Sequence, residues 1–382
     1  MTAPARSPSS WSTLPMFFEE GHRALGASLA DLRDDDVGLH DPKRVIPRLA
    51  ELGLTKLLVP GAERISVRSL SVAREALAYV SGTADSIFAV EGLGSYPFTL
   101  ANETDKRAAI LAEVTRGTRV CAFALTEPEA GSDVAAMKTT ARREGEHWVL
   151  DGEKVFISNV GIAHHYVVFA NADPSAGKKG ISAFLVDAGA PGLVTEPIAL
   201  HVDHPLGRLA FRGCKVPASA LVGEVGMGLR LALGTLDVFR TSVGAAAIGM
   251  AHRALDESIA RVKKRVQFGK PLAEQQLTQA ALADMATELD ASRLLVARAA
   301  WEKDHEALGA RSDGVSVAMA KMFATEAAQR IVDRGVQLFG GLGVVDGTVV
   351  ERLYREIRAL RIYEGTTEIQ KLIIGGALVR SR

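Results

Sequence analysis

A glutamate near the C-terminal end of the chain has neighbours that suit a general base. Glu364 follows an apolar and basic run, and Gly365 and Thr366 come directly after it. A second acid, Glu368, stands four residues on, before an apolar stretch. Burial raises the pKa of a carboxyl group and equips it to take a proton, whereas an acid at a helix start is often a solvated charge that the helix dipole favours. Spacing alone leaves both interpretations open for the two glutamates.

Two earlier segments join strand-like runs to residues that suit a polar, planar ligand. The run CAFALTEPEAGSD at 121–133 ends in a turn whose backbone N–H groups and hydroxyls are open to a ligand rich in acceptors. The run KVFISN places Phe156 and Ser158 two apart, on one face of a strand, where a ring and a hydroxyl would cover a planar group. The alternatives are a domain-linking loop for the first segment, and a core Phe with a solvent-facing Ser for the second.

Two later segments are basic or rich in glycine. RVQFGKPLAEQQ at 265–276 links two long helical patterns, and Arg265 could bind a phosphate with two hydrogen bonds. VQLFGGLG at 336–343 contains Gly340 and Gly341, which permit close approach of a ligand to the backbone. Each segment is a weak signal by itself, and the sequence contains no Walker or Rossmann fingerprint.

The composition describes a well-packed protein without net charge. The chain has 382 residues, 47% of them hydrophobic, with 45 basic and 45 acidic side chains. This length predicts two or three domains, and the absence of a net field disfavours nucleic acid and anionic membranes as partners. The sequence has no uncharged run of 18 apolar residues, so we expect no membrane-spanning helix. The N-terminal segment lacks the apolar core of a secretory signal. Cys121 and Cys214 predict buried thiols in a reducing compartment, and we expect a cytoplasmic protein.

The period of the apolar residues changes twice along the chain. From about 17 to 118 the spacing is mostly helical, and from about 119 to 224 it is that of strands. From about 225 onward, long Ala- and Leu-rich helices predict a bundle. Helices in the first part are expected to stop at glycines, and the stops are Gly53, Gly82 and Gly117. In the second part, Asp151 and Gly152 predict the turn of a β-hairpin. We therefore expect an α+β protein.

Histidines and serines give no further catalytic site. His164, His165, His201 and His204 lie in or beside predicted strands without a nearby cysteine, so we expect no metal site. The serines do not occur in a hydrolase nucleophile elbow.

Taken together, the segments LTEPEAGSD, RVQFGKPLAEQQ, QLFGGLG and IYEGTTEIQ strongly resemble the acyl-CoA dehydrogenase family of flavoproteins, in the same order over nearly the whole chain. The resemblance implies an N-terminal α-helical domain at 1–118, a middle β-barrel or sandwich domain at 119–224 and a C-terminal four-helix bundle at 225–382. It also implies FAD as cofactor, an acyl-CoA thioester as substrate, an electron-transfer flavoprotein as acceptor, and a homotetramer built as a dimer of dimers.

The resemblance assigns roles position by position. It makes Glu364 the base that removes the α-proton of the thioester. It assigns cofactor contacts to Phe123, Leu125, Thr126, Ser132, Phe156, Ser158, Arg265, Phe268, Gln276, Gln337, Gly340, Gly341, Thr366 and Glu368. It assigns substrate contacts to Ser132, Asp237, Arg240, Glu91, Ser95, Tyr363 and Gly365.

Departures from the family pattern bear on the substrate. Arg64 and Arg68 stand where the family has small residues near the mouth of the acyl pocket, and Glu91 and Ser95 fall on the helix that lines its floor. These polar residues predict a short, branched, cyclic or polar acyl group. Some relatives carry their base on the long helix near Asp237, but the neighbouring residues here do not match that subgroup.

The sequence is also compatible with other activities. They are an oxidase that passes electrons to oxygen, a thioester lyase without redox chemistry, and a dehydrogenase whose acyl group is attached to a carrier protein. Glu364 argues against the lyase, and the zero net charge argues against a relative that binds nucleic acid.

Overall fold

The structure is a computed structural model that describes residues 6–60, 64–306 and 314–380. Its internal contacts divide the chain into two compact units. The helical unit comprises Met1–Asp36, Ser66–Asp85 and Arg240–Arg382, and the sheet unit comprises Val37–Ile65 and Ser86–Phe239. The three domains expected at 1–118, 119–224 and 225–382 are divided by type of secondary structure, and these boundaries stay a prediction.

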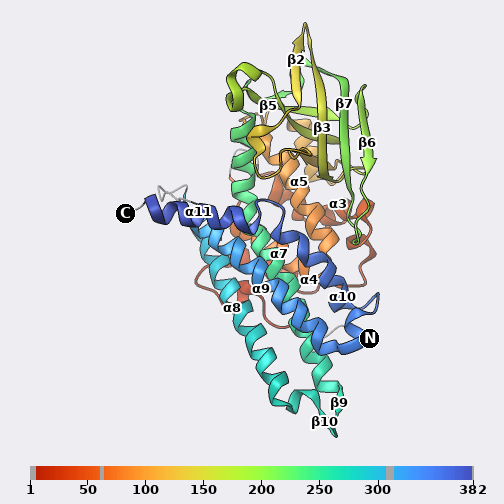
Figure 1. Cartoon of the computed structure of the whole chain (residues 1–382), viewed down its shortest axis with the longest axis vertical. Helices are drawn as coiled ribbons and strands as arrows, with labels where there is room; N and C mark the ends of the chain where they lie inside the picture. Colours follow the sequence, from red (N-terminus) through yellow and green to blue (C-terminus); the bar gives the residue numbers. More distant parts are fainter. Residues whose placement is uncertain (1–5, 61–63, 307–313, 381–382) are drawn as a thin grey trace. The chain divides into compact units, whose positions relative to one another are not determined.

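The described residues contain both helices and strands, which confirms the α+β class (Figure 1). The α-helices are α1 Ser10–Thr13, α2 Glu20–Ser28, α3 Pro42–Glu51, α4 Val67–Val80, α5 Gly82–Leu100, α6 Ala108–Thr115, α7 Gly228–Lys264, α8 Gln276–His305, α9 Val315–Phe339, α10 Val349–Ile357 and α11 Thr367–Arg380. The strands are β1 Cys121–Ala124, β2 Thr140–Glu144, β3 His147–Ser158, β4 His165–Asn171, β5 Ile181–Asp187, β6 Leu193–Pro197, β7 Leu206–Pro217, β8 Leu221–Val222, β9 Val266–Gln267 and β10 Lys270–Pro271.

The sheet unit is built around one mixed sheet. Its strand order is β6-β7-β3-β2-β4-β5-β8, and β1 pairs in parallel with β4. On one side, Trp148 and Phe184 belong to a buried cluster with residues of β7. On the other, Phe169 packs in a cluster with Phe98 of α5 and Leu231 of α7. Burial of both sides explains why the β4 sequence is an almost continuous apolar run rather than an alternating one.

The hairpin predicted at Asp151 and Gly152 is wrong. β3 runs unbroken from His147 to Ser158, and a β-bulge shifts its register against β7 between Leu150 and Gly152. The Asp-Gly pair suits a bulge as well as a turn, because Gly152 takes a φ of 143° and a Cβ there would collide with Thr139. The chain reverses instead after β2, where Gly145 has a φ of 56°.

Two of the three predicted helix stops are confirmed. Gly53 and Gly117 follow α3 and α6 with φ values of 74° and 70°. Gly82 does not stop a helix. It begins α5, and the break from α4 is Ser81, whose hydroxyl accepts the N–H of Ala84 at 3.1 Å. Glycine is needed at position 82 because a Cβ would lie 2.8 Å from the carboxyl group of Glu356.

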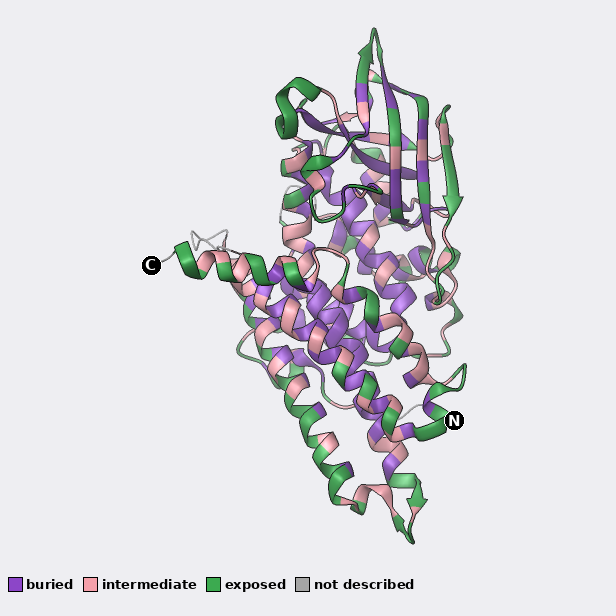
Figure 2. Cartoon of the chain, viewed as in Figure 1, coloured by how far each residue is buried: buried purple, intermediate pink, exposed green. Residues whose placement is uncertain are grey.

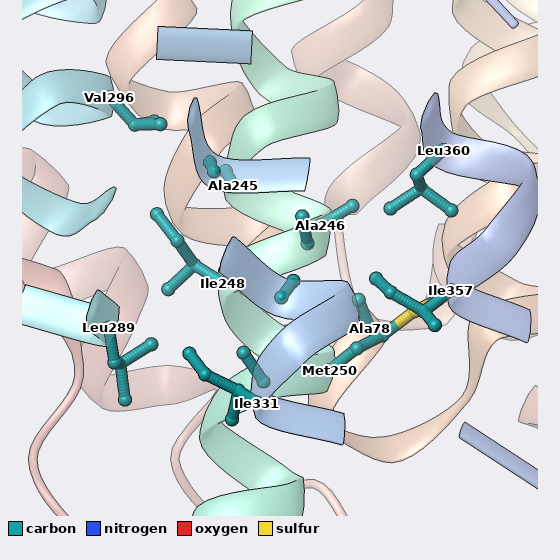
Figure 3. Close-up of a cluster of buried hydrophobic side chains, with 14 of the residues drawn as sticks. Ala78, Ala245, Ala246, Ile248, Met250, Leu289, Val296, Ile331, Ile357 and Leu360 are labelled. Atoms are coloured by element: carbon teal, nitrogen blue, oxygen red, sulfur yellow. The ribbon is translucent and has the colours of Figure 1, made fainter. Parts of the chain in front are cut away.

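Small residues of α7 lie in the core of the helical unit, together with larger residues of α8, α9 and α10. Figure 3 shows Ala245, Ala246 and Ile248 of α7 close to Leu289 of α8 and Ile331 of α9. Short side chains let the helices approach closely, which suits the bundle that the Ala- and Leu-rich pattern predicts. α7 is long and apolar enough to cross a membrane by length and composition, but 67% of its apolar window is buried inside the protein. Figure 2 shows these buried stretches on the helices, so α7 has the character of a core helix.

Candidate active site

Glu364 lies in a strained loop of the helical unit. The loop joins the 3-10 turn Arg358–Arg361 to α11, and Glu364 has a φ of 52°, in the left-handed region that non-glycine residues rarely adopt. Gly365 follows with a φ of 91°. Such strain persists only where the surroundings over-determine the backbone, and it is concentrated at functional sites.

The carboxyl group of Glu364 has the environment of a base. Its Oε2 is buried, and in the described part of the chain this atom has no hydrogen-bond partner. Burial raises the pKa of Glu364, while the positive charges of Arg74, Lys321 and Arg240 oppose the rise. A raised pKa together with an open acceptor atom is what proton abstraction requires.

Glu368 differs from Glu364 in every one of these respects. It is exposed in the first turn of α11, and hydrogen bonding by its own backbone N–H and by Thr366 holds its pKa below the ordinary value. Thr366 also accepts the N–H of Ile369 at 3.4 Å, in the manner of a helix cap. Glu364 therefore has the environment of a general base, and Glu368 has that of a solvated acid at a helix start.

A buried ion pair lies near the loop, and the sequence patterns did not single it out. Arg74 of α4 binds both carboxylate oxygens of Asp85 at 2.8 and 2.9 Å, and its third nitrogen donates to the hydroxyl of Ser242 at 3.0 Å. Both charged side chains are almost completely buried. The available signal was a charged residue inside the apolar pattern of each of two helices, Arg74 in α4 and Asp85 in α5, but the sequence does not show that the two residues pair.

The predicted LTEP segment of the sheet unit is fixed by another buried pair. Lys154 of β3 donates to the carbonyl of Leu125 at 3.0 Å and to Oε1 of Glu127 at 2.8 Å. The backbone N–H groups of Lys138 and Thr139 bind the same carboxylate, and the carbonyl of Thr126 accepts the N–H of Val155 at 3.0 Å. Burial lowers the pKa of Lys154 to about 8, against the raising effect of Glu127. The pair thus sets the shape of the turn.

The other residues predicted to contact the cofactor from the sheet unit differ in their exposure. Phe156 sits at a second bulge of β3, has a φ of 57° and is 63% exposed as a residue. Ser158 shares a hydrogen bond of 2.7 Å with Nε2 of His204. Ser132 is exposed in the turn after LTEP. Phe123, in contrast, packs its ring against Phe169 at 4.9 Å and is partly buried.

The residues predicted for the phosphate and adenosine end are exposed in the helical unit. Phe268 lies at the tip of the β9–β10 hairpin with a φ of 51°, and the residue is 95% exposed. Arg265 and Gln276 are exposed on either side of it. Gln337, Gly340 and Gly341 are likewise exposed at the end of α9, and a Cβ on either glycine would meet nothing within 4 Å.

The predicted substrate residues lie on helices and on the strained loop. Asp237 and Arg240 are three residues apart on α7, and Nε of Arg240 donates to the carbonyl of Glu364 at 3.2 Å. Tyr363 and Gly365 flank the base in the loop. In α5 the hydroxyl of Ser95 donates to a helix carbonyl, that of Glu91, at 2.8 Å.

The inference from Arg68 needs correction. Arg68 is buried in the helical unit, where its guanidinium binds Asp304 at 2.7 Å and Glu19 at 2.9 Å. These ion pairs give it a structural role and remove the support that it lent to a polar acyl group. Arg64 is exposed in the sheet unit, so its bearing on the substrate stays a prediction.

The carboxyl group of Glu91 is bound by a backbone N–H of the protein, and its protonation state can be tested. Its Oε2 accepts the N–H of Cys121 at 2.8 Å, whereas its buried Oε1 has no partner among the described residues. Burial raises its pKa to about 8, so the folded state binds a proton that the unfolded state has lost. Stability is therefore full below the unfolded pKa of about 4.5 and falls as the pH rises through about 8.

We expect Glu91→Gln to be more stable than the wild type at pH 9 by at least about 1 kcal/mol, because the neutral amide cannot ionise. At pH 5 the two proteins should melt at similar temperatures. Thermal melting at both pH values measures the difference, and an equal or lower stability of the variant at pH 9 would contradict the assignment.

The described residues contain no group of three or more His, Cys, Asp or Glu side chains that could hold a metal ion. His165 is buried, and burial lowers its pKa to about 3. His204 is partly buried and shares a hydrogen bond with Ser158, and desolvation of its ring lowers its pKa to about 4.

Comparison with known proteins agrees with this architecture. The family models for the acyl-CoA dehydrogenase middle domain and C-terminal domain match residues 122–214 and 226–379. A 3-(aryl)acrylate reductase from Clostridium sporogenes is 35% identical over 96% of this chain and 100% of its own length. The human mitochondrial short-chain specific acyl-CoA dehydrogenase is 37% identical over 89% of this chain and 83% of its own length. The structure of butyryl-CoA dehydrogenase from Megasphaera elsdenii matches with a TM-score of 0.87 and 32% identity, over 95% of this chain and 99% of that one.

The residues present fit the cofactor of these proteins, which is FAD. A glutaryl-CoA dehydrogenase from Mycobacterium smegmatis, solved in complex with FADH2, matches with a TM-score of 0.86 and 26% identity, over 96% of each chain. In the present structure, the exposed Phe156 suits contact with a flat ring system, and the bare backbone at Gly340 and Gly341 permits close approach of a ligand. From its matched domains, its relatives and its fold, the chain belongs to the acyl-CoA dehydrogenase family.

Proposed function

We propose that the protein oxidises a short, branched, cyclic or polar acyl-CoA to the α,β-unsaturated thioester, with Glu364 removing the α-proton. The observation that carries this proposal is the buried Oε2 of Glu364, which has no hydrogen-bond partner in the described part of the chain. The backbone of Glu364 adopts the left-handed conformation. An open carboxylate oxygen held in a strained loop is arranged to accept a proton rather than to stabilise the fold.

The charges around Glu364 suit this task. Protons next to a thioester carbonyl are weakly acidic, so the base needs a raised pKa and a site from which water is excluded. Burial provides the raised pKa of Glu364, and the cations Arg74, Lys321 and Arg240 keep the ionised form accessible. Bound FAD supplies an acceptor for the hydride that leaves the β-carbon.

The backbone of the same residue offers a place for the thioester oxygen. Within the described residues, the N–H of Glu364 donates to no acceptor. An N–H that is held rigidly in a strained loop can stabilise the negative charge that develops on a carbonyl oxygen when its α-proton leaves. We assign it this role together with Glu364 as the base.

The preference for a short acyl group is supported by similarity to proteins named for short-chain substrates. The 3-(aryl)acrylate reductase relative adds an aryl-substituted three-carbon acid to the candidates. We further propose an electron-transfer flavoprotein as acceptor, a homotetramer and a cytoplasmic location. Phe268 and Leu277 are 95% and 88% exposed. They form apolar surface that a second copy of the chain would cover.

A substrate screen tests the function. The purified holoenzyme is mixed under nitrogen with butyryl-, isobutyryl-, 3-phenylpropionyl- and palmitoyl-CoA, and loss of the yellow flavin absorbance is followed. We expect the fastest bleaching with an acyl group of about six carbons or fewer, or with the aryl substrate, because a small pocket is filled best by a small group. Faster bleaching by palmitoyl-CoA would refute the size preference, and no bleaching by any thioester would refute the dehydrogenase function.

The acceptor is tested on the reduced enzyme from the same experiment. We expect slow reoxidation in air and fast reoxidation by an electron-transfer flavoprotein. Fast reoxidation in air alone would identify an oxidase instead.

A further inference from the structure

Three consecutive backbone carbonyls around the proposed base are each held by a side chain. Nζ of Lys321 donates to the carbonyl of Tyr363 at 3.1 Å and to that of Gly365 at 2.7 Å. The carbonyl between them, that of Glu364, accepts from Nε of Arg240 at 3.2 Å. Nε2 of Gln370 adds a second hydrogen bond to the Gly365 carbonyl at 2.9 Å. One residue, Lys321, therefore binds the loop backbone on both sides of Glu364.

The position of Lys321 is unusual for a lysine. It lies in the N-terminal half of α9 and is 0% exposed. Among the described residues it forms no ion pair within 4.0 Å, and its ammonium group donates to the two loop carbonyls. Burial of an ammonium group is costly unless its donors are used, and a bundle core could hold an apolar residue here at less cost. The burial of a charge at this point therefore indicates a role in shaping the loop.

We propose that Lys321 is a positioning residue, which holds the Tyr363–Gly365 loop in the conformation that aims the Glu364 carboxylate at the substrate. This inference rests on the proposed role of Glu364 as the base. A φ of 52° at Glu364 is unfavourable by itself, and the two hydrogen bonds from Lys321, one to each neighbouring peptide, oppose its relaxation. A base that is displaced by about 1 Å loses on the order of a hundredfold in rate, so we expect the hydrogen bonds from Lys321 to affect turnover.

Lys321 also acts on Glu364 through its charge. Burial raises the pKa of Glu364, and Arg74, Lys321 and Arg240 each lower it, while Asp85 raises it. Loss of the Lys321 charge removes one of these cations and leaves the pKa of Glu364 higher. Because the base acts only when it is ionised, its activity should then appear at a higher pH.

The charged groups that face Lys321 itself act in both directions. Burial lowers its pKa to about 8, Arg240 lowers it further, and Glu364, Glu326 and Glu368 raise it. The wild-type enzyme therefore changes charge at Lys321 near pH 8, and the comparison of variants extends on both sides of that value.

The test compares Lys321→Met with a control on the same helix. Thr325→Val removes a buried hydroxyl one turn along α9. Among the described residues this hydroxyl donates to the backbone carbonyls of Lys321 and Met322 in the same helix, so its loss perturbs the helix but removes no hydrogen bond to the loop. Both variants are isolated with bound FAD, and the rate of flavin reduction is measured from pH 6 to 10. We expect Lys321→Met to lower the limiting rate by about tenfold to a hundredfold and to shift the pH midpoint upward, and Thr325→Val to change the rate by less than about twofold.

Further variants keep the test decisive. Lys321→Gln retains a donor without the charge, so it should restore part of the limiting rate but not the pH midpoint, and it replaces Lys321→Met if that variant does not fold. In a Glu364→Gln background, Lys321→Met should have little further effect, because residues that act through one another are not additive. A crystal structure of Lys321→Met should show φ of Glu364 outside the left-handed region.

The outcomes separate the two claims. A folded Lys321→Met enzyme with the wild-type rate and pH midpoint would overturn the positioning role while Glu364→Gln remains slow. If Glu364→Gln itself reacts at the wild-type rate, the proposed function fails. A parallel loss of rate in Lys321→Met and Thr325→Val, with an unchanged midpoint, would assign Lys321 a structural role and also overturn the inference.

Discussion

Glu364→Gln should slow the reduction of bound FAD by an acyl-CoA by about 10²–10⁴-fold. The amide keeps the size of the side chain, but it has no basic oxygen to receive the α-proton. FAD content and thioester binding should survive, because the backbone N–H of Glu364 and its contact with Arg240 through the carbonyl are unchanged. Stopped-flow absorbance under nitrogen measures the rate, and titration of the flavin spectrum measures thioester binding.

Glu368→Gln is the matched control for this result. Glu368 is an acid four residues away, but it is exposed in the first turn of α11 and its pKa is lowered by hydrogen bonding to its own backbone N–H and to Thr366. We expect nearly normal chemistry, with at most weaker FAD binding. Equal and small effects of the two substitutions would contradict the assignment of Glu364 and would move the search for a base to α7 around Asp237.

Arg74→Met should destabilise the protein by about 3–5 kcal/mol, because it leaves the carboxylate of Asp85 buried without its partner. The structure gives Asp85 a two-pronged hydrogen bond from Arg74, and both side chains are almost completely buried. Loss of the cation should also raise the pKa of Glu364, since Arg74 lowers it. Chemical unfolding followed by circular dichroism measures the free energy, and the pH dependence of flavin reduction measures the second effect.

Two comparisons show whether the buried pair is responsible. The double variant Arg74→Met with Asp85→Leu removes both charges and should recover much of the lost stability. Arg33→Met breaks an ion pair with Asp35 whose side chains are 76% and 75% exposed, so its cost should stay below about 1 kcal/mol. A cost for Arg74→Met as small as that of Arg33→Met would contradict the contribution of the buried pair to stability.

Much of the fold could be predicted from the period of the apolar residues. The change of period near residue 119 marks the start of the sheet at β1, and the return of helical spacing near 225 precedes α7. Local patterns failed where one pair of residues suits two structures. Asp151 and Gly152 were assigned to a turn because Asp-Gly favours one, yet the same pair forms a bulge inside β3.

The identity of the site residues depended on resemblance, and their chemistry depended on contacts that spacing cannot show. Phe156, Phe268 and Glu364 all have φ in the left-handed region. Phe and Glu rarely adopt this conformation, so their residue types do not predict it. Lys321 reaches carbonyls that are 42 and 44 residues away in the sequence. Arg68 illustrates the opposite error, since a charge that was assigned to the substrate is bound by Asp304, 236 residues away.

The central claim is that Glu364 removes the α-proton, and the exchange of that proton with solvent tests it most directly. The holoenzyme is incubated under nitrogen, without an electron acceptor, with butyryl-CoA deuterated at the α-carbon, and loss of deuterium is followed by NMR. Net oxidation then stops after one turnover, while removal and return of the proton can continue. We predict exchange by the wild type and by Glu368→Gln, and a rate lower by at least about a hundredfold for Glu364→Gln. Exchange by Glu364→Gln at the wild-type rate, with FAD and thioester bound, would contradict the account.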